Sequence, residues 1–128
     1  MKDAIRTDLA PPPGGYYSQG VVAGPFIFVS GQLPLDLEGR VQGDTIGEQT
    51  RKALDNVAAV LRANDASLDH LVSVTVYVSD IGLWPEVNEV YAECLASVEI
   101  PPARAVVPTR ELHYGAMIEV SAIAYFLR

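Results

Sequence analysis

The amino-acid sequence predicts an α+β fold with the element order ββαβαββ, in a single domain that spans residues 1–128. Two segments, 71–78 and 117–126, alternate between an aliphatic and a mixed set of residues, which is the period of a strand. Two others, which begin at Ile46 and near Pro85, repeat apolar residues at 3.6-residue spacing and so predict helices. This order predicts a mixed sheet that carries both helices on one face.

The composition limits the partners that the chain can have. Of its 128 residues, 49% are hydrophobic and 20% are charged, which is typical of a globular protein with a core. The formal net charge of −7 disfavours nucleic acid as a partner. No apolar run has the length of a membrane span, and residues 1–10 lack the apolar centre of a signal peptide. Cys94 is the single cysteine and has no internal disulfide partner, so we expect a cytoplasmic protein.

The first part of the chain is predicted to be an arm followed by a β-hairpin. The arm covers residues 10–15, where three prolines and two glycines favour neither helix nor strand. Residues 16–23 and 26–30 are rich in β-forming types and flank a Gly-Pro turn, so they predict two paired strands. Residues 32–43 are predicted to form a loop.

A capping box predicts the start of the first helix. Thr45 and Glu48 have the spacing at which each side chain bonds the other residue's backbone N–H. The helix is expected to end at Asn64-Asp65, and its inward stripe is Ile46, Thr50, Ala53, Leu54, Val57, Val60 and Leu61. Pro85 suits the first turn of the second helix. Its expected inward side chains are Val87, Val90, Tyr91, Cys94, Leu95 and Val98.

The two long strands each have one aliphatic face and one mixed face. In 71–78 the aliphatic face is Val72, Val74, Val76 and Val78, and the mixed face is Leu71, Ser73, Thr75 and Tyr77. In 117–126 the aliphatic face is Ile118, Val120, Ala122, Ala124 and Phe126, and the mixed face is Met117, Glu119, Ser121, Ile123 and Tyr125. Two helices cover only one side of a sheet. The mixed faces therefore predict packing against other subunits in a symmetric oligomer, with a monomer whose mixed face is hydrated as the alternative.

Two charged residues have mostly apolar neighbours. Arg104 lies in 101–108, which is predicted to be a short strand bounded by prolines. Its guanidinium either covers apolar surface or awaits a planar anion. Glu119 is the one carboxylate on the buried-looking last strand, a place where unpaired carboxylates are rare. Together they indicate an active site, although an Arg104–Glu119 ion pair would explain both residues structurally.

Motifs for other chemistries are absent. His70 and His113 stand apart from each other, with no HExxH sequence and no cysteine cluster. GxSxG, Walker A and GxGxxG sequences do not occur. We therefore expect neither a metal ion nor an organic cofactor.

Six segments in register resemble the RidA/YjgF family of enamine/imine deaminases, over about residues 11–126. They are Gly15-Tyr16-Tyr17-Ser18-Gln19, Val29-Ser30-Gly31-Gln32, Ala53-Leu54-Asp55-Asn56-Val57, Val87-Asn88-Glu89-Val90-Tyr91, Pro102-Ala103-Arg104 and Ile118-Glu119-Val120. The resemblance implies a chorismate-mutase-like fold and a homotrimer with three ligand clefts between subunits. It also implies hydrolysis of 2-imino acids, such as 2-iminopropanoate and 2-iminobutanoate, to 2-keto acids and ammonia.

The resemblance also implies roles for individual residues. By position, Arg104 resembles the family's carboxylate-binding arginine, and Glu119 resembles the glutamate that handles the water. The other substrate-binding positions of the family's cleft correspond to Tyr17, Ser30, Gly31 and Asn88. The family often has a cysteine two positions after the arginine, where this chain has Val106. A thiol therefore has no role at that position.

The chemistry that the resemblance implies needs few residues. An imine carbon is already electrophilic, so catalysis consists of holding the carboxylate, placing a water and moving protons. Arg104 can hold a carboxylate by two parallel hydrogen bonds, and Glu119 can deprotonate water and return the proton to the leaving nitrogen. Backbone amides near Ser30 and Gly31 could also bind the carboxylate.

Two alternatives stay open at this point. The chain could be a non-catalytic trimer that binds small carboxylates or a protein client. It could also be a deaminase of a larger substrate, such as an aminomuconate-like acid. Retention of Arg104 favours an enzyme, and we expect the loop 109–116 to influence the choice among imino acids.

Overall fold

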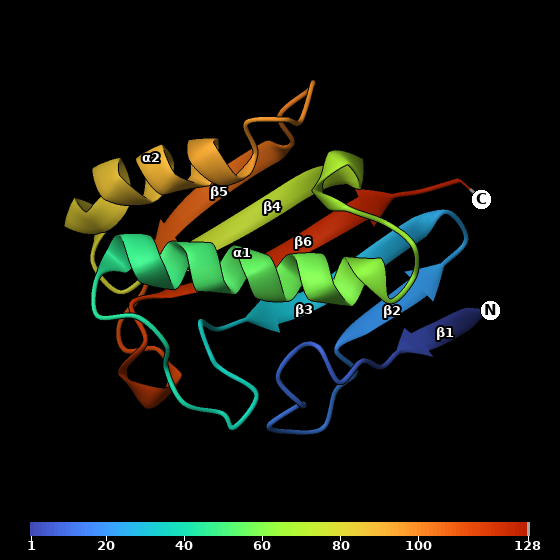
Figure 1. Ribbon diagram of the computed structural model, residues 1–128, viewed down its shortest axis with the longest axis horizontal. Coiled ribbons are helices and arrows are strands. Elements are labelled where there is room, and N and C mark those ends of the chain that lie inside the picture. Colours follow the sequence, from blue (N-terminus) through green and yellow to red (C-terminus); the bar gives the residue numbers. More distant parts are fainter. Residues whose placement is uncertain (128) are drawn as a thin grey trace.

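The computed structural model describes residues 1–127 as a six-stranded sheet with two helices on one face (Figure 1). The strands are β1 (Lys2–Ile5), β2 (Gly20–Ala23), β3 (Phe26–Gln32), β4 (Leu71–Val78), β5 (Ala103–Pro108) and β6 (Ile118–Tyr125). The helices are α1 (Ile46–Arg62) and α2 (Trp84–Cys94), and short 3₁₀ turns cover Leu68–His70, Ile81–Leu83 and His113–Gly115. The predicted α+β class, with both helices on one side, is confirmed.

The strand order in the sheet is β1-β2-β3-β6-β4-β5. Strands β4 and β5 are parallel, because α2 crosses over between them, and the other neighbouring pairs are antiparallel. Strand β5 lies at an edge, where Pro108 removes no hydrogen bond from a central ladder. The final strand β6 is central, between β3 and β4, so the residues of β6 are positioned by two neighbours.

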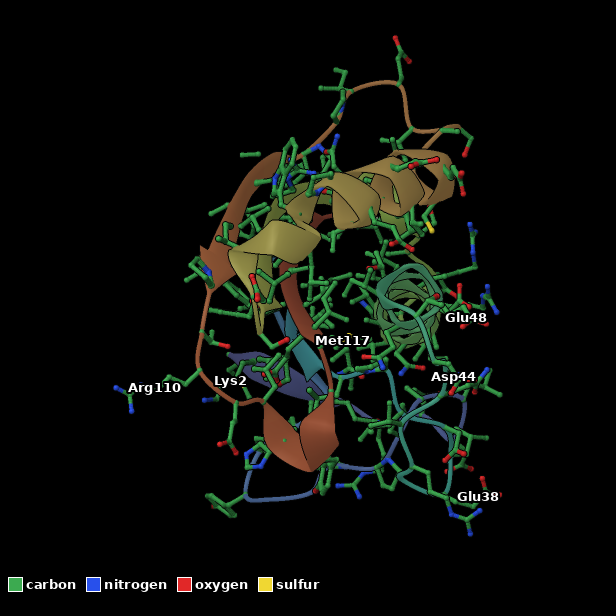
Figure 2. All side chains as sticks on the ribbon, turned by 90° about the vertical axis from the view of Figure 1, so that its left-hand side faces the viewer. Lys2, Glu38, Asp44, Glu48, Arg110 and Met117 are labelled. Atoms are coloured by element: carbon green, nitrogen blue, oxygen red, sulfur yellow. The ribbon has the colours of Figure 1, made fainter. Side chains whose placement is uncertain are left out.

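The start of α1 follows the predicted capping box. The Thr45 hydroxyl accepts a hydrogen bond from the Glu48 N–H at 3.1 Å, and Glu48 Oε1 accepts one from the Thr45 N–H at 3.1 Å. Figure 2 shows Glu48 and Asp44 on the outer side of the molecule at this helix end. The helix ends at Arg62, shortly before Asp65 adopts a left-handed conformation with φ of 64°. Among residues 1–127 no helix is both long and apolar enough to cross a membrane.

The hydrophobic core lies between α1 and the sheet. The inner face of α1 contributes fully buried side chains at Leu54, Val57, Val60 and Leu61. The facing side of the sheet contributes Ile27, Val74, Val76, Val78, Ile118 and Val120, each at most 1% exposed. Full burial of such a side chain stabilises the fold by about 1.5–3 kcal/mol. This layer fixes which side of each strand faces the helices.

The N-terminal region differs from the prediction in two ways. Strand β1 was not expected, since Ile5 is its only buried residue and its pairing with β2 is a non-local contact. The strand predicted over 16–23 is wrong at its start, because β2 begins at Gly20. The side-chain amide of Gln19 instead donates to the backbone oxygens of Thr7, Ala10 and Pro11. These bonds hold the preceding arm outside the ladder.

The predicted faces of β4 are correct except at its first two residues. Leu71 is 4% exposed and Val72 is 43% exposed, the reverse of the alternation seen in the rest of the strand. The pairing of β4 with β6 shifts register between Leu71 and Ser73. An irregularity of this kind adds one residue to one strand and exchanges the faces on one side of it.

Candidate active site

A cavity of about 640 Å³ opens at the end of β3. Its walls are the proline-rich arm, the segment from Leu33 to Gly39 and the turn at His113-Tyr114. The loop 109–116 therefore reaches this cavity, although its influence on substrate choice stays a prediction. Four of the residues predicted for the site line the cavity together: Tyr17, Ser30, Gly31 and Glu119.

Glu119 is a half-buried carboxylate that accepts no hydrogen bond from residues 1–127. Burial raises the pKa of Glu119 above its ordinary value, and the nearby His113 acts in the opposite direction. His113 and Glu119 both line the cavity. A carboxyl group with a raised pKa holds a proton more readily near neutral pH, as a group that both accepts and returns a proton requires.

Gly31 is required by the position of the Glu119 side chain. A Cβ atom added to Gly31 would lie 3.0 Å from Cδ of Glu119 and closer still to its Oε2. Real Cβ atoms essentially never approach other heavy atoms this closely, so any larger residue at 31 displaces the carboxylate. The β3–β6 register is interrupted between Val29 and Gln32, and the resulting irregularity brings Gly31 against β6.

The polar groups of Ser30 already have protein partners. Its hydroxyl donates to the Ser18 carbonyl oxygen at 2.6 Å, and its backbone N–H donates to the Gln19 carbonyl oxygen at 3.0 Å. Of the backbone amides near Ser30 and Gly31 that were predicted to bind a carboxylate, the Ser30 N–H is therefore excluded, because it is occupied by Gln19. The hydroxyl oxygen of Ser30 retains acceptor capacity toward the cavity.

Tyr17 borders the same cavity from the arm. Its hydroxyl accepts a hydrogen bond from the Gly14 N–H at 3.1 Å, and its side chain is 51% exposed. The hydroxyl end of the side chain is thus fixed to the arm, while about half of the side chain is exposed. Such a residue can cover a bound molecule without being buried itself.

Arg104 and Asn88 form a second group away from this cavity. Arg104 Nη1 donates to Oδ1 of Asn88 at 2.9 Å, and its guanidinium carbon lies 4.8 Å from the centre of the Tyr91 ring. No carboxylate among residues 1–127 lies within salt-bridge distance of Arg104. The alternative of a structural Arg104–Glu119 ion pair is therefore wrong for one subunit.

The two groups lie on opposite faces of the sheet. Arg104 is paired with Val74, which is buried under the helices, and its bond to α2 confirms that side. Glu119 is paired with Tyr77 and alternates with Ile118 and Val120, which face the core. Within one subunit, the predicted anion-binding Arg104 lies on the helix side of the sheet and the predicted catalytic Glu119 lies on the opposite side.

Sequence reasoning missed three residues that shape these groups. Gln19 ties the arm to β2, His113 acts to lower the pKa of Glu119, and Tyr91 lies under Arg104. The prediction that Tyr91 faces inward is confirmed by its 7% exposure, and it follows Asn88 by three residues, the spacing that places two side chains on one helix face. In the described part of the chain, no three His, Cys, Asp or Glu side chains gather to hold a metal ion.

Comparisons with known proteins agree with this fold and with the motifs. The family model described as endoribonuclease L-PSP matches residues 7–126. A RutC family protein of Pyrococcus horikoshii is 43% identical over 126 residues, covering 98% of each chain. The structure of the E. coli YjgF gene product is 35% identical, with a TM-score of 0.90 over 96% of this chain and 98% of that one.

A second structure, E. coli TdcF with bound serine, is 31% identical, with a TM-score of 0.92 over 98% of this chain and 99% of that one. These relatives align along almost their full lengths, so the aligned region spans both the cavity and the Arg104 group. The family-model match, the identities and the shared fold show that this chain belongs to the RidA/YjgF family, whose model carries the description endoribonuclease L-PSP.

Proposed function

We propose that this protein is a metal-free hydrolytic deaminase of small 2-imino acids, such as 2-iminopropanoate and 2-iminobutanoate. The proposal is best supported by two charged side chains, Arg104 and Glu119, that form no ion pair with residues 1–127. The Arg104 side chain has only the neutral Asn88 as a hydrogen-bond partner in residues 1–127, and the Glu119 carboxylate has none there. Isolated charges of this kind are costly in a protein interior and are found where a ligand completes them.

In the proposed reaction, Arg104 binds the carboxylate of the imino acid by parallel N–H···O bonds. Glu119 accepts a proton from a water molecule as the water oxygen adds to the imine carbon. Glu119 passes that proton to the imine nitrogen, which gives the neutral carbinolamine. The Glu119 carboxylate then accepts the proton of the carbinolamine hydroxyl and delivers it to the amine nitrogen as the carbon–nitrogen bond breaks, so that ammonia leaves and a 2-keto acid remains. The raised pKa of Glu119 suits both proton transfers.

The remaining predicted residues have supporting roles in this proposal. Tyr17 covers the substrate with its exposed ring, Gly31 makes room for the Glu119 carboxylate, and Asn88 orients Arg104. Ser30 contributes the acceptor capacity of its hydroxyl oxygen. No step of the scheme calls for a metal ion or an organic cofactor, because the imine is already an electrophile.

We also propose that the reaction site lies between subunits of a homotrimer. Arg104 and Glu119 face opposite sides of one sheet, so a site that uses both requires a neighbour. The sheet face away from the helices supports such packing, since Phe28 and Tyr125 are 43% and 42% exposed there beside partly buried Thr75 and Ser121. Light scattering at micromolar concentration should give the mass of a trimer. A stable monomer mass would contradict the shared cleft.

The most direct test is a coupled assay. A pyridoxal-phosphate lyase acting on serine or cysteine generates 2-iminopropanoate, and release of 2-keto acid is followed with and without this protein. We expect a rate clearly above the uncatalysed hydrolysis of the imine, unchanged after dialysis against a chelator. A rate equal to the uncatalysed one would contradict the proposal. We further propose that the protein removes reactive enamines in the cytoplasm, the location that its single cysteine favours.

A second candidate is a non-catalytic trimer that binds small carboxylates. The bound serine in the E. coli TdcF structure favours it, since serine carries a carboxylate. Binding of pyruvate without imine hydrolysis would support this candidate. Activity only toward a larger, aminomuconate-like acid would instead indicate the alternative substrate.

The family description also raises the possibility of RNA cleavage. A net charge of −7 disfavours binding to a phosphate backbone, so we expect no cleavage when RNA replaces the imine in the same preparation.

A further inference from the structure

Tyr91 contacts Arg104 but has no role in the proposed reaction so far. Tyr91 is on the inner face of α2 and is 7% exposed. The Arg104 guanidinium carbon lies over its ring, 4.8 Å from the centre. Asn88, one turn earlier on the same helix, accepts a hydrogen bond from Nη1 of Arg104 at 2.9 Å. Two side chains of α2 therefore act on one guanidinium of β5.

The two contacts restrict different motions of Arg104. An aromatic face attracts a cation and limits its distance and tilt. The bond to Asn88 limits rotation of the guanidinium within its own plane. A guanidinium carries five N–H groups, and this bond is the only one that Arg104 donates from its side chain to residues 1–127. The remaining N–H groups are thus oriented while they stay available to another acceptor.

We propose that Tyr91 is a positioning residue that holds the Arg104 guanidinium ready for the substrate carboxylate. This inference rests on the proposed function, because it assumes that Arg104 binds an anion. A planar fork gains its advantage over a point charge only when its two N–H groups face both carboxylate oxygens together. A flexible arginine on an edge strand would lose conformational freedom on binding, and a pre-oriented one loses less.

The ring of Tyr91, rather than its hydroxyl, is assigned this role. The hydroxyl oxygen is buried and has no hydrogen-bond partner in the described part of the chain. Burial raises the pKa of the hydroxyl, while the positive charge of Arg104 opposes that shift, so the group is neutral at physiological pH. A phenylalanine presents the same ring face to a cation. Tyr91→Phe should therefore retain Arg104 function, whereas Tyr91→Leu should not.

The test compares pyruvate inhibition and imine hydrolysis in matched variants. Tyr91→Leu should raise both KM for 2-iminopropanoate and the inhibition constant of pyruvate by about tenfold, with a smaller change in kcat. For Tyr91→Phe, both KM and the inhibition constant of pyruvate should stay within about twofold of the parent values, far below the tenfold change expected for Tyr91→Leu. Tyr91→Met, which fills a similar space with a flexible chain, replaces Tyr91→Leu if the latter does not fold.

Leu95→Ala is the matched control. Leu95 directly follows the last residue of α2 and is also 7% exposed, but the hydrogen bond and the ring contact of the Arg104 side chain are with Asn88 and Tyr91 and not with Leu95. It should lower thermal stability without changing KM or pyruvate inhibition. In an Arg104→Ala background, Tyr91→Leu should cause no further loss of pyruvate binding, because the residue through which it acts is gone.

Three results would overturn the inference while leaving the deaminase proposal intact: an unchanged KM in Tyr91→Leu, an equal KM increase in Leu95→Ala, or a further loss in the double variant. A Tyr91→Phe variant as impaired as Tyr91→Leu would also overturn it, since the hydroxyl would then be the active group. A parent protein that neither hydrolyses the imine nor binds pyruvate would overturn the deaminase proposal and this inference together.

Discussion

Charged side chains on the outer surface of the helices differ from those on the strands in how they are paired. Glu48 accepts hydrogen bonds from the Asp44 and Thr45 backbone N–H groups, which lowers the pKa of Glu48. On the same helix Arg51 forms an ion pair with Glu93 at 2.7 Å, with both side chains about half exposed. On the strands, Glu119 has no hydrogen-bond partner and Arg104 has no carboxylate in residues 1–127.

The difference separates charges that complete the fold from charges that await a ligand. Glu48 satisfies the free N–H groups at a helix start, a purely local task. The exposed Arg51–Glu93 pair contributes little to stability, as surface ion pairs generally do. Arg104 and Glu119 are partly buried and incompletely satisfied, which costs stability unless another molecule supplies the missing partner. Arg51 and Glu48 therefore serve as references for Arg104 and Glu119.

The largest effect is expected from Arg104→Ala. Hydrogen bonds to a charged group contribute roughly 1.5–3 kcal/mol each, and each 1.36 kcal/mol is a factor of ten in rate. We therefore expect kcat/KM for imine hydrolysis to fall about a hundredfold or more, with fold and trimer intact. Arg104→Lys should recover little of it, because an ammonium does not match the planar fork.

Arg51→Ala is the reference for that experiment. It removes the same type of side chain from an exposed ion pair, so kcat/KM should not change. Unfolding or dissociation of Arg104→Ala, or full activity in the folded trimer, would contradict the assignment of Arg104 to an external anion.

Glu119→Gln should have the next largest effect. The substitution keeps the shape of the side chain but removes the base, so kcat should fall about a hundredfold, the lower end of the usual range for general acid–base catalysis. Glu48→Gln provides the comparison and should leave kcat unchanged. A Glu119→Gln variant as active as the parent would leave Glu119 with a structural role only.

A smaller loss is expected from Gly31→Ala. The added Cβ would lie too close to the Glu119 side chain, so the carboxylate must move away. We expect kcat to fall about tenfold, which corresponds to ~1.4 kcal/mol. The same substitution in a Glu119→Gln background should cause no comparable loss. An equal loss in both backgrounds would show that Gly31 acts independently of Glu119.

The smallest effects concern stability and have opposite signs at the two carboxylates. The raised pKa of Glu119 means that its stabilising contribution is present when it is protonated and is lost as pH rises through that pKa. Glu119→Gln should therefore have a higher Tm than the parent at pH 7, and the difference should disappear below about pH 4.

At Glu48 the pKa is lowered, so its contribution is present at neutral pH and is lost as pH falls through that lowered pKa. Glu48→Gln should lower Tm slightly at pH 7 and have less effect in acid. Thermal unfolding of the two variants and the parent across pH 3–8 measures both differences. The same sign at both positions would contradict the contrast between a satisfied and an unsatisfied carboxylate.

Several features of the fold could be predicted because they depend on neighbours in sequence. The Thr45–Glu48 capping box, the stripe of α1 and the alternation of β6 each arise within one turn or a few strand residues. Strand β1 could not be predicted, since its pairing with β2 joins Asp3 to Val22. The exchange of Leu71 and Val72 likewise depends on the register against β6.

The sequence by itself determined the types of residue at the candidate site and, by resemblance, the family. It identified Arg104 and Glu119 as charges among apolar neighbours, and the resemblance to the family's cleft positions identified Tyr17, Ser30, Gly31 and Asn88. Alternation within one strand can be read from the chain, because successive side chains take opposite faces.

Only the tertiary structure decided which of these residues meet. The register of β5 against β4 places Arg104 beside the buried Val74, under α2 and over the Tyr91 ring. The interrupted register of β3 against β6 brings Gly31 to Glu119 on the other face. Strand registers are set by contacts between segments far apart in the chain, each compatible with several pairings until the core packs. That is why residue identity could be predicted locally, while the separation of Arg104 from Glu119 could not.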